Sequence, residues 1–476
     1  MKDEKTLRSQ AEEFPNIEAL LALIDYRMED AAGNLQYGLS RLFLHDTLYG
    51  KKAATRALAE LLTPVLWLLS KAKNRAVKKA DPRLAFSNTF LLSSRYAKTR
   101  EATEKATGCT AILTFTDLLK RENPDQQINL KASLKPERHN VRPIYFRGAG
   151  IIGGKLQKAV VRYCELKFAA KEKNDAEIEK ALQHLETAYT KQLSRVTDCL
   201  RREGCALYLT VNQYNMRDLL IIHACHELGI RTFQQEHHAT QFNREVYDEN
   251  HPVTRLSFVG EYGFWSKSEQ LFHEKVYHYE SFFYRPEEIR FRVTGNPEMN
   301  REDAEKTRRQ YPPERKLTLM LASMQDYELE GKRDAYEQWR MDIFRGLKAL
   351  SEKQKIIINI RYTPNKELDL REKEAPILKA FGFRISESVP ANLMEDLCSS
   401  VAIMSSTSSV LSTARLFGKM VFRVQDWEPE YSYVHVDDEV HEVTPEDIPN
   451  ILIPEGLEKT VPEIDPEGIF DINRIK

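Results

Sequence analysis

Residues Ile403–Val424 read IMSSTSSVLSTARLFGKMVFRV, and the organisation of the chain can be worked out from this segment. The apolar residues 401–404 predict the end of a buried strand. Five hydroxyl residues, 405–409, follow where a short helix must begin, and Gly418 stands where a helix C-terminus favours a left-handed residue. Met420–Val424 is strand-like again. The stretch therefore predicts a strand, a serine-rich turn, a helix and a second strand.

The serine-rich turn allows two interpretations. A hydroxyl before a helix caps its first free N–H groups, and one serine in that place indicates only a cap. The same N–H groups, together with the helix dipole, favour an anion. Five consecutive hydroxyl residues exceed what one cap needs, so we expect a phosphate or diphosphate to bind here. The candidate residues are Ser405, Ser406, Thr407 and Ser408.

The composition is that of a soluble protein with several domains. The chain has 476 residues, of which 42% are hydrophobic and 30% charged, so two or three domains with real cores are expected. A net charge of -1 argues against nucleic acid as a partner. No apolar run is long enough to cross a membrane, and the charged N-terminus lacks the apolar part of a signal peptide. The six cysteines form no C-x-x-C pair, which favours reduced thiols in the cytoplasm over a disulfide framework or a zinc site.

Residues 1–82 predict a helical region outside the α/β pattern. Within it, an apolar block at residues 61–69 contains Trp67 and runs into the basic segment Lys71–Lys79. A basic amphipathic segment with tryptophan is typical of peripheral contact with an anionic membrane, and for a cytoplasmic protein this would be the inner face of the membrane. The alternative is a helical cap packed on the protein with a solvated basic end.

Strands and helices alternate from residue 84 onward. A charged, proline-bearing linker at 301–315 separates two such series. We therefore predict two doubly wound parallel-sheet domains at 83–300 and 316–476, facing a cleft, with an acidic tail after Trp427 that crosses back or covers an edge. The expected strands are 84–88, 111–115, 143–146, 206–211, 231–235, 256–259 and 290–293, then 317–322, 355–359, 383–386, 401–404 and 420–424; a helix or helix pair is expected at 155–201.

Two strand ends in the first domain carry candidate functional residues. The loop after residue 235 begins with Glu236, His237 and His238, which can supply a general base or donors to a developing phosphate charge. The alternative is that these side chains only satisfy hydrogen bonds within a loop. A metal is not predicted, because no third ligand is evident. Candidates for binding an acceptor follow the strand 206–211: Asn212, Tyr214, Asn215 and Arg217, with helix capping by Asn215 as the alternative.

The second domain offers further candidates at its strand ends. Arg361 places a cation where it can meet a diphosphate, and Ser323 ends the first strand of the domain. Gly295 and Asn296 form a turn just before the linker. Gly295 and Asn296 are also counted as candidate donor-site residues. For Arg361 and Ser323 the alternative is an ordinary loop position, and their shared location at strand ends is what favours a ligand site.

The two restarted α/β domains, the Thr294–Pro297 turn and the serine cluster before a helix ending in Leu416–Lys419 resemble the GT-B glycosyltransferases. The resemblance covers about residues 84 to 425 and extends to bacterial capsule and surface-polysaccharide enzymes that use CMP-sugars or CDP-glycerol. It implies that the serines hold the nucleotide phosphate and that residues 236–238 supply catalytic or acceptor-binding groups. It also implies that Gly295, Asn296 and Pro297 form the turn into the linker.

Two positions depart from the pattern of that family. Arg361–Pro364 matches the strand-end His-Pro motif of the CMP-sugar and CDP-glycerol enzymes, but Thr363 stands where the family has histidine. Thr413 stands where many GT-B enzymes have a glutamate that binds the ribose. The first departure removes a donor to the leaving phosphate, and the second removes the usual ribose contact.

These expectations combine in a GT-B glycosyltransferase of capsule or lipopolysaccharide biosynthesis. It would move a sugar or a polyol phosphate from a CMP-, CDP- or UDP-linked donor to a surface-glycan or lipid-linked acceptor. The scheme needs no cofactor or metal beside the nucleotide-sugar co-substrate, because helix N-termini and arginine can carry the diphosphate charge. The alternatives are a nucleotide-sugar 2-epimerase of the same architecture and a non-catalytic partner in a polysaccharide assembly complex.

Overall fold

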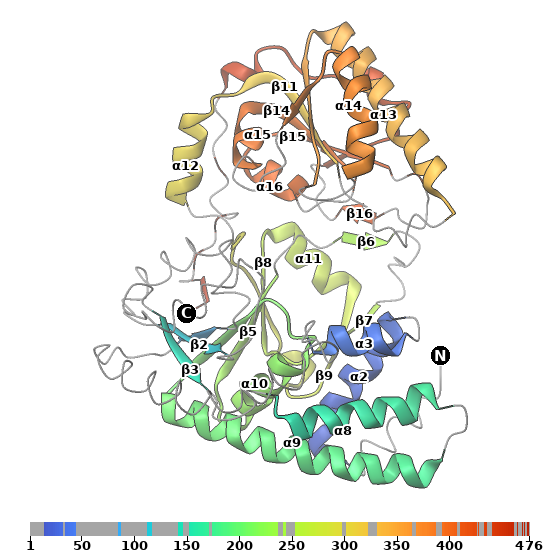
Figure 1. Cartoon of the computed structure of the whole chain (residues 1–476). Coiled ribbons are helices and arrows are strands. Elements are labelled where there is room, and N and C mark those ends of the chain that lie inside the picture. Colours follow the sequence, from blue (N-terminus) through green and yellow to red (C-terminus); the bar gives the residue numbers. More distant parts are fainter. Residues whose placement is uncertain are drawn as a thin grey trace.

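The structure is a computed structural model of the whole chain. The residues that it describes are 14–31, 34–43, 84–86, 112–116, 141–145, 152–170, 174–236, 241–243, 253–297, 301–321, 331–363, 368–386, 393–406, 410–425, 427, 433–435, 440–460, 464, 469, 471 and 474–475. Two parallel sheets dominate these residues, one in each half of the chain (Figure 1).

The first sheet has seven strands in the order β10-β8-β5-β4-β1-β2-β3, and every neighbouring pair is parallel. Read along the chain, this is a doubly wound order that reverses between β1 and β4. Its strands are β1 (Leu84–Phe86), β2 (Ile112–Thr116), β3 (Val141–Tyr145), β4 (Leu207–Thr210), β5 (Arg231–Gln235), β8 (Glu261–Phe264) and β10 (Arg290–Val293). The helices of this half are α2 (Glu18–Asp30), α3 (Leu35–Leu42), α8 (Gly154–Cys164), α9 (Asp175–Glu203), α10 (Met216–Glu227) and α11 (Lys267–Val276).

The second sheet has six parallel strands in the order β13-β12-β11-β14-β15-β17. Numbered along the chain this is 3-2-1-4-5-6, the Rossmann order, and the reversal lies between β11 and β14. Its strands are β11 (Glu314–Met320), β12 (Ile357–Arg361), β13 (Arg384–Ser386), β14 (Ser400–Ser405), β15 (Met420–Val424) and β17 (Val440–Val443). The helices are α12 (Arg301–Gln310), α13 (Arg333–Gln354), α14 (Leu368–Ala380), α15 (Leu393–Ser399) and α16 (Val410–Leu416).

Each sheet has its own hydrophobic core. Leu219, Ile222 and Phe264 belong to the first core, and Phe344, Ile358 and Met404 to the second. Two doubly wound domains in one chain are the layout of the GT-B fold, so the predicted fold class is confirmed.

The described part of the N-terminal helical region packs into the first domain. Ile17, Leu20 and Ile24 are fully buried in the same core as Leu185 and Tyr189 of α9. These helices are therefore part of that domain's core rather than a separate layer. Lys71–Lys79 lie outside the described residues. In the part of the chain that the structure describes, no helix has the length and apolarity that crossing a bilayer requires.

The segment expected as a linker is largely a helix. α12 occupies residues 301–310, and β11 already begins at Glu314. Ala304 is buried against Leu416, Phe417 and Ile469, so α12 packs on the second domain. This helix was not predicted because its sequence, REDAEKTRRQ, has Ala304 as its one apolar residue and so shows no helical hydrophobic pattern.

The strand expected at 256–259 is displaced. Val253–Ser257 forms β7, which pairs in parallel with β9 (Tyr277–Ser281) in a separate two-stranded sheet. The place in the main sheet is taken by β8, four residues further on. β8 reads EYGF, and glycine and glutamate are depleted in strands, so the residues 256–259 gave the stronger strand signal.

Two further elements join the domains. β6 (Gln241–Asn243) pairs antiparallel with β16 (Tyr433–His435), so a strand that follows β5 meets a strand that follows β15 (Figure 1). The C-terminal tail also returns to the first domain. The Asp471 N–H donates to the Thr294 carbonyl at 3.0 Å, and the Arg231 Nη2 donates to the Ile475 carbonyl at 2.7 Å. The prediction that the tail crosses back is confirmed.

Candidate functional site

The carboxyl ends of β11 and β14 meet at the reversal point of the second sheet. Ser405 is the last residue of β14 and is fully buried. Its hydroxyl donates a hydrogen bond of 2.6 Å to the Met320 carbonyl at the end of β11. Ligands in doubly wound sheets bind beyond the strand ends at this reversal. Ser405 therefore joins the ends of β11 and β14 at the candidate site, and Ser406 is the first residue beyond β14.

The end of β12 is tied to the same edge. The Thr363 Oγ1 donates to the Leu321 carbonyl at 2.9 Å, and the Leu321 N–H donates to the Arg361 carbonyl at 2.9 Å. Thr363, the residue that departs from the family's histidine, thus supports the backbone at the strand ends.

Arg361 is held inside the second domain. Its Nη1 donates to the Asp396 Oδ2 at 2.8 Å, and both residues are buried. Asn359 and Ser386 contact the other carboxylate oxygen, at 3.1 Å and 2.9 Å. The charge of Arg361 is therefore balanced by Asp396, and contact of Arg361 with a diphosphate stays a prediction.

Arg423 is a residue that the sequence interpretation missed. It lies in β15 beside Ser405 in the sheet register and is only 1% exposed. Its Nε donates to the Ser406 carbonyl at 3.3 Å, and its Nη1 forms an ion pair of 2.9 Å with Glu442. A charged residue within the buried strand Met420–Val424 was the signal that could have revealed it. Arg423 therefore holds the backbone of Ser406, the residue that directly follows β14.

The predicted donor-site residues divide by position. Ser405, Ser406 and Arg361 lie at the carboxyl ends of strands in the second sheet, whereas Gly295 and Asn296 follow β10 in the first domain. Ser323, Thr407 and Ser408 lie outside the described residues.

The turn before α12 contacts the second domain. Gly295 adopts a φ of 85°, in the left-handed region that favours glycine. The next residue, Asn296, is buried and donates from Nδ2 to the Thr413 Oγ1 of α16 at 3.4 Å. Thr413, which stands where many GT-B enzymes have a ribose-binding glutamate, therefore takes part in a contact between the domains.

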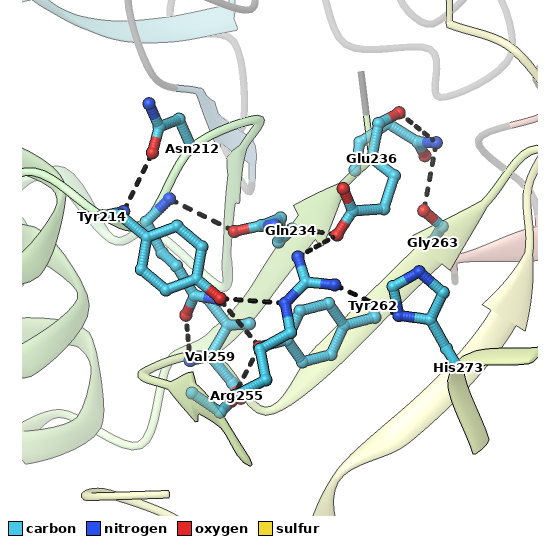
Figure 2. Close-up of polar contacts among 12 residues, drawn as sticks. Asn212, Tyr214, Gln234, Glu236, Arg255, Val259, Tyr262, Gly263 and His273 are labelled. Carbon is cyan, nitrogen blue, oxygen red and sulfur yellow. Dashed lines mark hydrogen bonds and ion pairs between the residues drawn. The ribbon is translucent and has the colours of Figure 1, made fainter. Parts of the chain in front are cut away.

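In the first domain, Glu236 immediately follows β5 and is buried. Its Oε1 accepts hydrogen bonds from the Arg255 Nη2 at 2.8 Å and the Gln234 Nε2 at 3.0 Å (Figure 2). The carboxylate is thus paired with a guanidinium. His237 and His238 lie outside the described residues, and the catalytic roles predicted for the three residues stay predictions.

The predicted acceptor residues surround the start of α10. Asn215 caps this helix, because its side chain accepts from the Asp218 N–H at 3.0 Å. Asn212 accepts from the Tyr214 N–H at 2.9 Å. Arg217 is buried in the first turn. The capping alternative for Asn215 is therefore observed, and acceptor binding by these residues stays a prediction.

Asp218 explains why this turn is rigid. Its carboxylate accepts hydrogen bonds from the Tyr208 hydroxyl, from the Thr210 hydroxyl at 2.9 Å and from Asn215 Nδ2 at 2.6 Å. Burial raises the pKa of Asp218, and these hydrogen bonds oppose the rise. The loop after β4 is thus held in place by a buried carboxyl group that accepts hydrogen bonds from three side chains.

Arg255 brings two of the predicted sites together. Its Nε donates to the Tyr214 hydroxyl at 3.0 Å while its Nη2 binds Glu236 (Figure 2). The loop after β4 and the residue after β5 are therefore joined through one side chain that the sequence interpretation did not select. Its only sequence signal was a lone arginine in the apolar surroundings of residues 253–259.

The described residues contain no group of three His, Cys, Asp or Glu side chains that could hold a metal ion. Among them, Cys164, Cys199, Cys205, Cys225 and Cys398 are buried free thiols.

The topology and the strand-end residues define a two-domain protein of GT-B type with a candidate ligand site on the second domain. Among solved structures, the chain is similar to UDP-GlcNAc 2-epimerase from Neisseria meningitidis bound to UDP-GlcNAc, at 12% identity over 81% of this chain and 95% of that chain, with a TM-score of 0.42. It is also similar to the wall teichoic acid polymerase TagF, at 11% identity over 79% of each chain and a TM-score of 0.34. MurG from Acinetobacter baumannii has 10% identity over 79% of this chain and 89% of that chain, with a TM-score of 0.34.

No protein-family model and no curated protein matches the chain.

Proposed function

We propose that the protein is a glycosyltransferase that binds a nucleotide-activated donor on its second domain. The observation that carries this proposal is a pair of hydrogen bonds at the reversal point of the second sheet. The Ser405 hydroxyl donates to the Met320 carbonyl, and the Arg423 guanidinium donates to the Ser406 carbonyl. A doubly wound sheet presents its ligand site at this edge, and a turn rich in hydroxyl groups beside a helix start suits phosphate.

The nucleotide would be a co-substrate linked to a sugar or to a polyol phosphate. Its phosphates would lie at the turn that begins with Ser406, since the Ser405 proton is already donated to Met320. Donors of this turn would stabilise the negative charge that develops on the departing nucleotide. Thr363 and Thr413 are occupied by backbone and interdomain contacts, so base and ribose recognition would use other groups.

The acceptor would bind at the carboxyl edge of the first sheet. Asn212 and Tyr214 follow β4 and Glu236 follows β5, so these residues share that edge. A base from residues 236–238 would take the proton of an acceptor hydroxyl as its oxygen attacks the donor and the nucleotide leaves. A glycan or lipid-linked acceptor is proposed, and a membrane-bound acceptor would account for the basic segment Lys71–Lys79.

The proposal is tested by product analysis. The protein is incubated with CMP-, CDP- and UDP-linked donors, with and without bacterial glycan or lipid acceptors, and the products are identified by mass spectrometry and NMR. Acceptor-dependent release of nucleotide, with a new linkage on the acceptor, is the expected result. Conversion of the donor to its epimer without acceptor would identify the 2-epimerase instead. Absence of any reaction or nucleotide binding would favour the non-catalytic partner.

A further inference from the structure

Arg255 distributes its three guanidinium nitrogens over three separate parts of the first domain. The Nε donates to the Tyr214 hydroxyl at 3.0 Å, in the loop after β4. The Nη1 contacts the His273 Nδ1 of α11 at 3.1 Å, and the Nη2 contacts the Glu236 Oε1 at 2.8 Å. Figure 2 shows the guanidinium at the centre of these side chains. Because arginine only donates, His273 accepts at Nδ1 and carries its proton on Nε2.

This guanidinium is mostly buried and is surrounded by aromatic rings. Its centre lies 5.2–6.0 Å from the ring centroids of four tyrosines. The side chains of Arg255 and Glu236 are 16% and 4% exposed. Burial alone would lower the pKa of Arg255. Tyr214 and Glu236 raise it instead, so the pKa of Arg255 lies well above its usual value. The four tyrosines are Tyr214, Tyr262, Tyr277 and Tyr279.

Stability alone does not account for such a pair. Removing two charges from water carries a desolvation cost that can exceed their mutual attraction, and buried ion pairs can often be replaced by apolar residues without loss of stability. What the pair does provide is direction, because a guanidinium binds each partner along a fixed line. Arg255 therefore fixes the relative placement of the segments that it joins.

Glu236 is held by its backbone as well as by its side chain. Its N–H donates to the Gly263 carbonyl at 2.9 Å, and its own carbonyl accepts from the Trp265 Nε1 at 2.7 Å. Gln235 Nε2 also donates to this carbonyl, at 3.2 Å. Glu236 is thus anchored on all sides at the point where the chain leaves β5 toward residues 237 and 238.

We propose that Arg255 is a positioning residue for the acceptor side of the site. It clamps Glu236 and Tyr214, and so fixes both the exit of the chain from β5 and the loop 212–215. Glu236 is the anchor in this arrangement, which leaves the role of proton acceptor to the histidines that follow it. The inference deepens the proposed function, because it concerns the edge to which the acceptor is assigned.

The test is hydrogen exchange followed by mass spectrometry on the full chain, comparing the wild type with the double variant Arg255→Met/Glu236→Gln. The double variant removes both charges together, so neither is left buried and unpaired. We expect exchange at least tenfold faster in peptides covering 212–215 and 236–243, with unchanged exchange in α9. The readout needs no substrate, so it stands whether or not transferase activity is found.

The single variant Arg255→Lys makes the test sharper. A lysine ammonium keeps the charge but has no fixed fork of donors. It can hold Glu236 while losing Tyr214, so we expect faster exchange at 212–215 and retained protection at Glu236. Once a donor is known, kcat should fall at least tenfold in the double variant while the KM for the donor changes less than threefold.

A matched control lies at the opposite edge of the same sheet. Arg231 begins β5 and Glu261 begins β8, and their side chains form an ion pair of 2.7 Å. Arg231→Met/Glu261→Gln should leave exchange at 212–215 and 236–243 unchanged. Faster exchange throughout the first domain in the Arg255 double variant would show a general structural role and overturn the proposal. Unchanged exchange at both segments would overturn it as well.

Discussion

The Ser405 hydroxyl donates to the Met320 carbonyl across the reversal point of the second sheet, at 2.6 Å. This contact joins the ends of the two strands between which the proposed nucleotide would sit. It also uses the only proton of the Ser405 side chain. We therefore predict different roles for Ser405 and Ser406 at this edge.

Ser405→Ala and Ser406→Ala should differ in their effects. Ser405→Ala leaves the buried Met320 carbonyl without its side-chain donor, so the free energy of unfolding should fall by about 1 kcal/mol while nucleotide affinity changes less than about threefold. Ser406→Ala removes a hydroxyl from the turn that is proposed to bind the phosphate and should weaken binding about tenfold. Urea unfolding and titration calorimetry measure the two effects. Loss of affinity in the Ser405 variant alone would reverse the assignment.

Arg423→Met should weaken nucleotide binding. The variant removes the donor to the Ser406 carbonyl, so the backbone of Ser406 loses a hydrogen bond that holds it in place. We expect affinity to fall about tenfold, as for the loss of one hydrogen bond to a charged group. Glu442→Gln is the matched control, because it removes the charge of the partner but keeps its shape. A folded Arg423 variant with wild-type affinity would rule out this role.

Gly263→Ala should destabilise the first domain. A Cβ on this residue of β8 would lie 2.5 Å from the Phe233 Cζ and 2.6 Å from the Thr294 Oγ1. We expect a loss of about 1–3 kcal/mol in the free energy of unfolding, the usual cost of overpacking. Gly153→Ala is the control, since its Cβ would meet only the end of the flexible Gln192 side chain. Equal stability of the two variants would contradict the packing seen around β8.

His223 should make stability depend on pH. Burial lowers the pKa of His223 from 6.5 to about 4, against an opposing effect of Glu227. Between these values the unfolded chain binds a proton that the folded chain does not, so stability falls as the pH falls from 6.5 to 4. The loss is at most about 3 kcal/mol.

The variant His223→Gln tests this dependence, because it keeps a polar partner for the Tyr189 hydroxyl, which lies 3.0 Å from the His223 Nδ1. Urea unfolding at several pH values should show a smaller acid loss in the variant than in the wild type. Equal losses in both would show that His223 is protonated alike in the folded and unfolded chains.

Much of the fold could be predicted because its local signals agree. The strand 231–235 was predicted with the bounds of β5, and Gly229 and Gly418 end helices with φ of 66° and 65°. Alternation of strands and helices then requires parallel sheets. β8 and α12 were missed, because the first contains Glu261 and Gly263, which are unusual in strands, and the second lies in a charged segment.

The candidate site was less predictable than the fold. Sequence position locates strand ends, so Ser405 and Glu236 were found at the correct edges. It does not show which polar side chains are already engaged, and Ser405, Arg361 and Glu236 all have partners inside the protein. Arg255 and Arg423 were missed because their importance depends on partners far away in the chain.

We propose above that a nucleotide binds the second domain at the end of β14. The most direct measurement is titration calorimetry of the full chain against CMP, CDP, UDP and GDP, with the Ser406→Ala variant beside the wild type. We predict that the wild type binds at least one of the nucleoside diphosphates or CMP saturably, and that the variant binds it with about tenfold lower affinity. No binding across the panel, or equal binding to both chains, would contradict the claim.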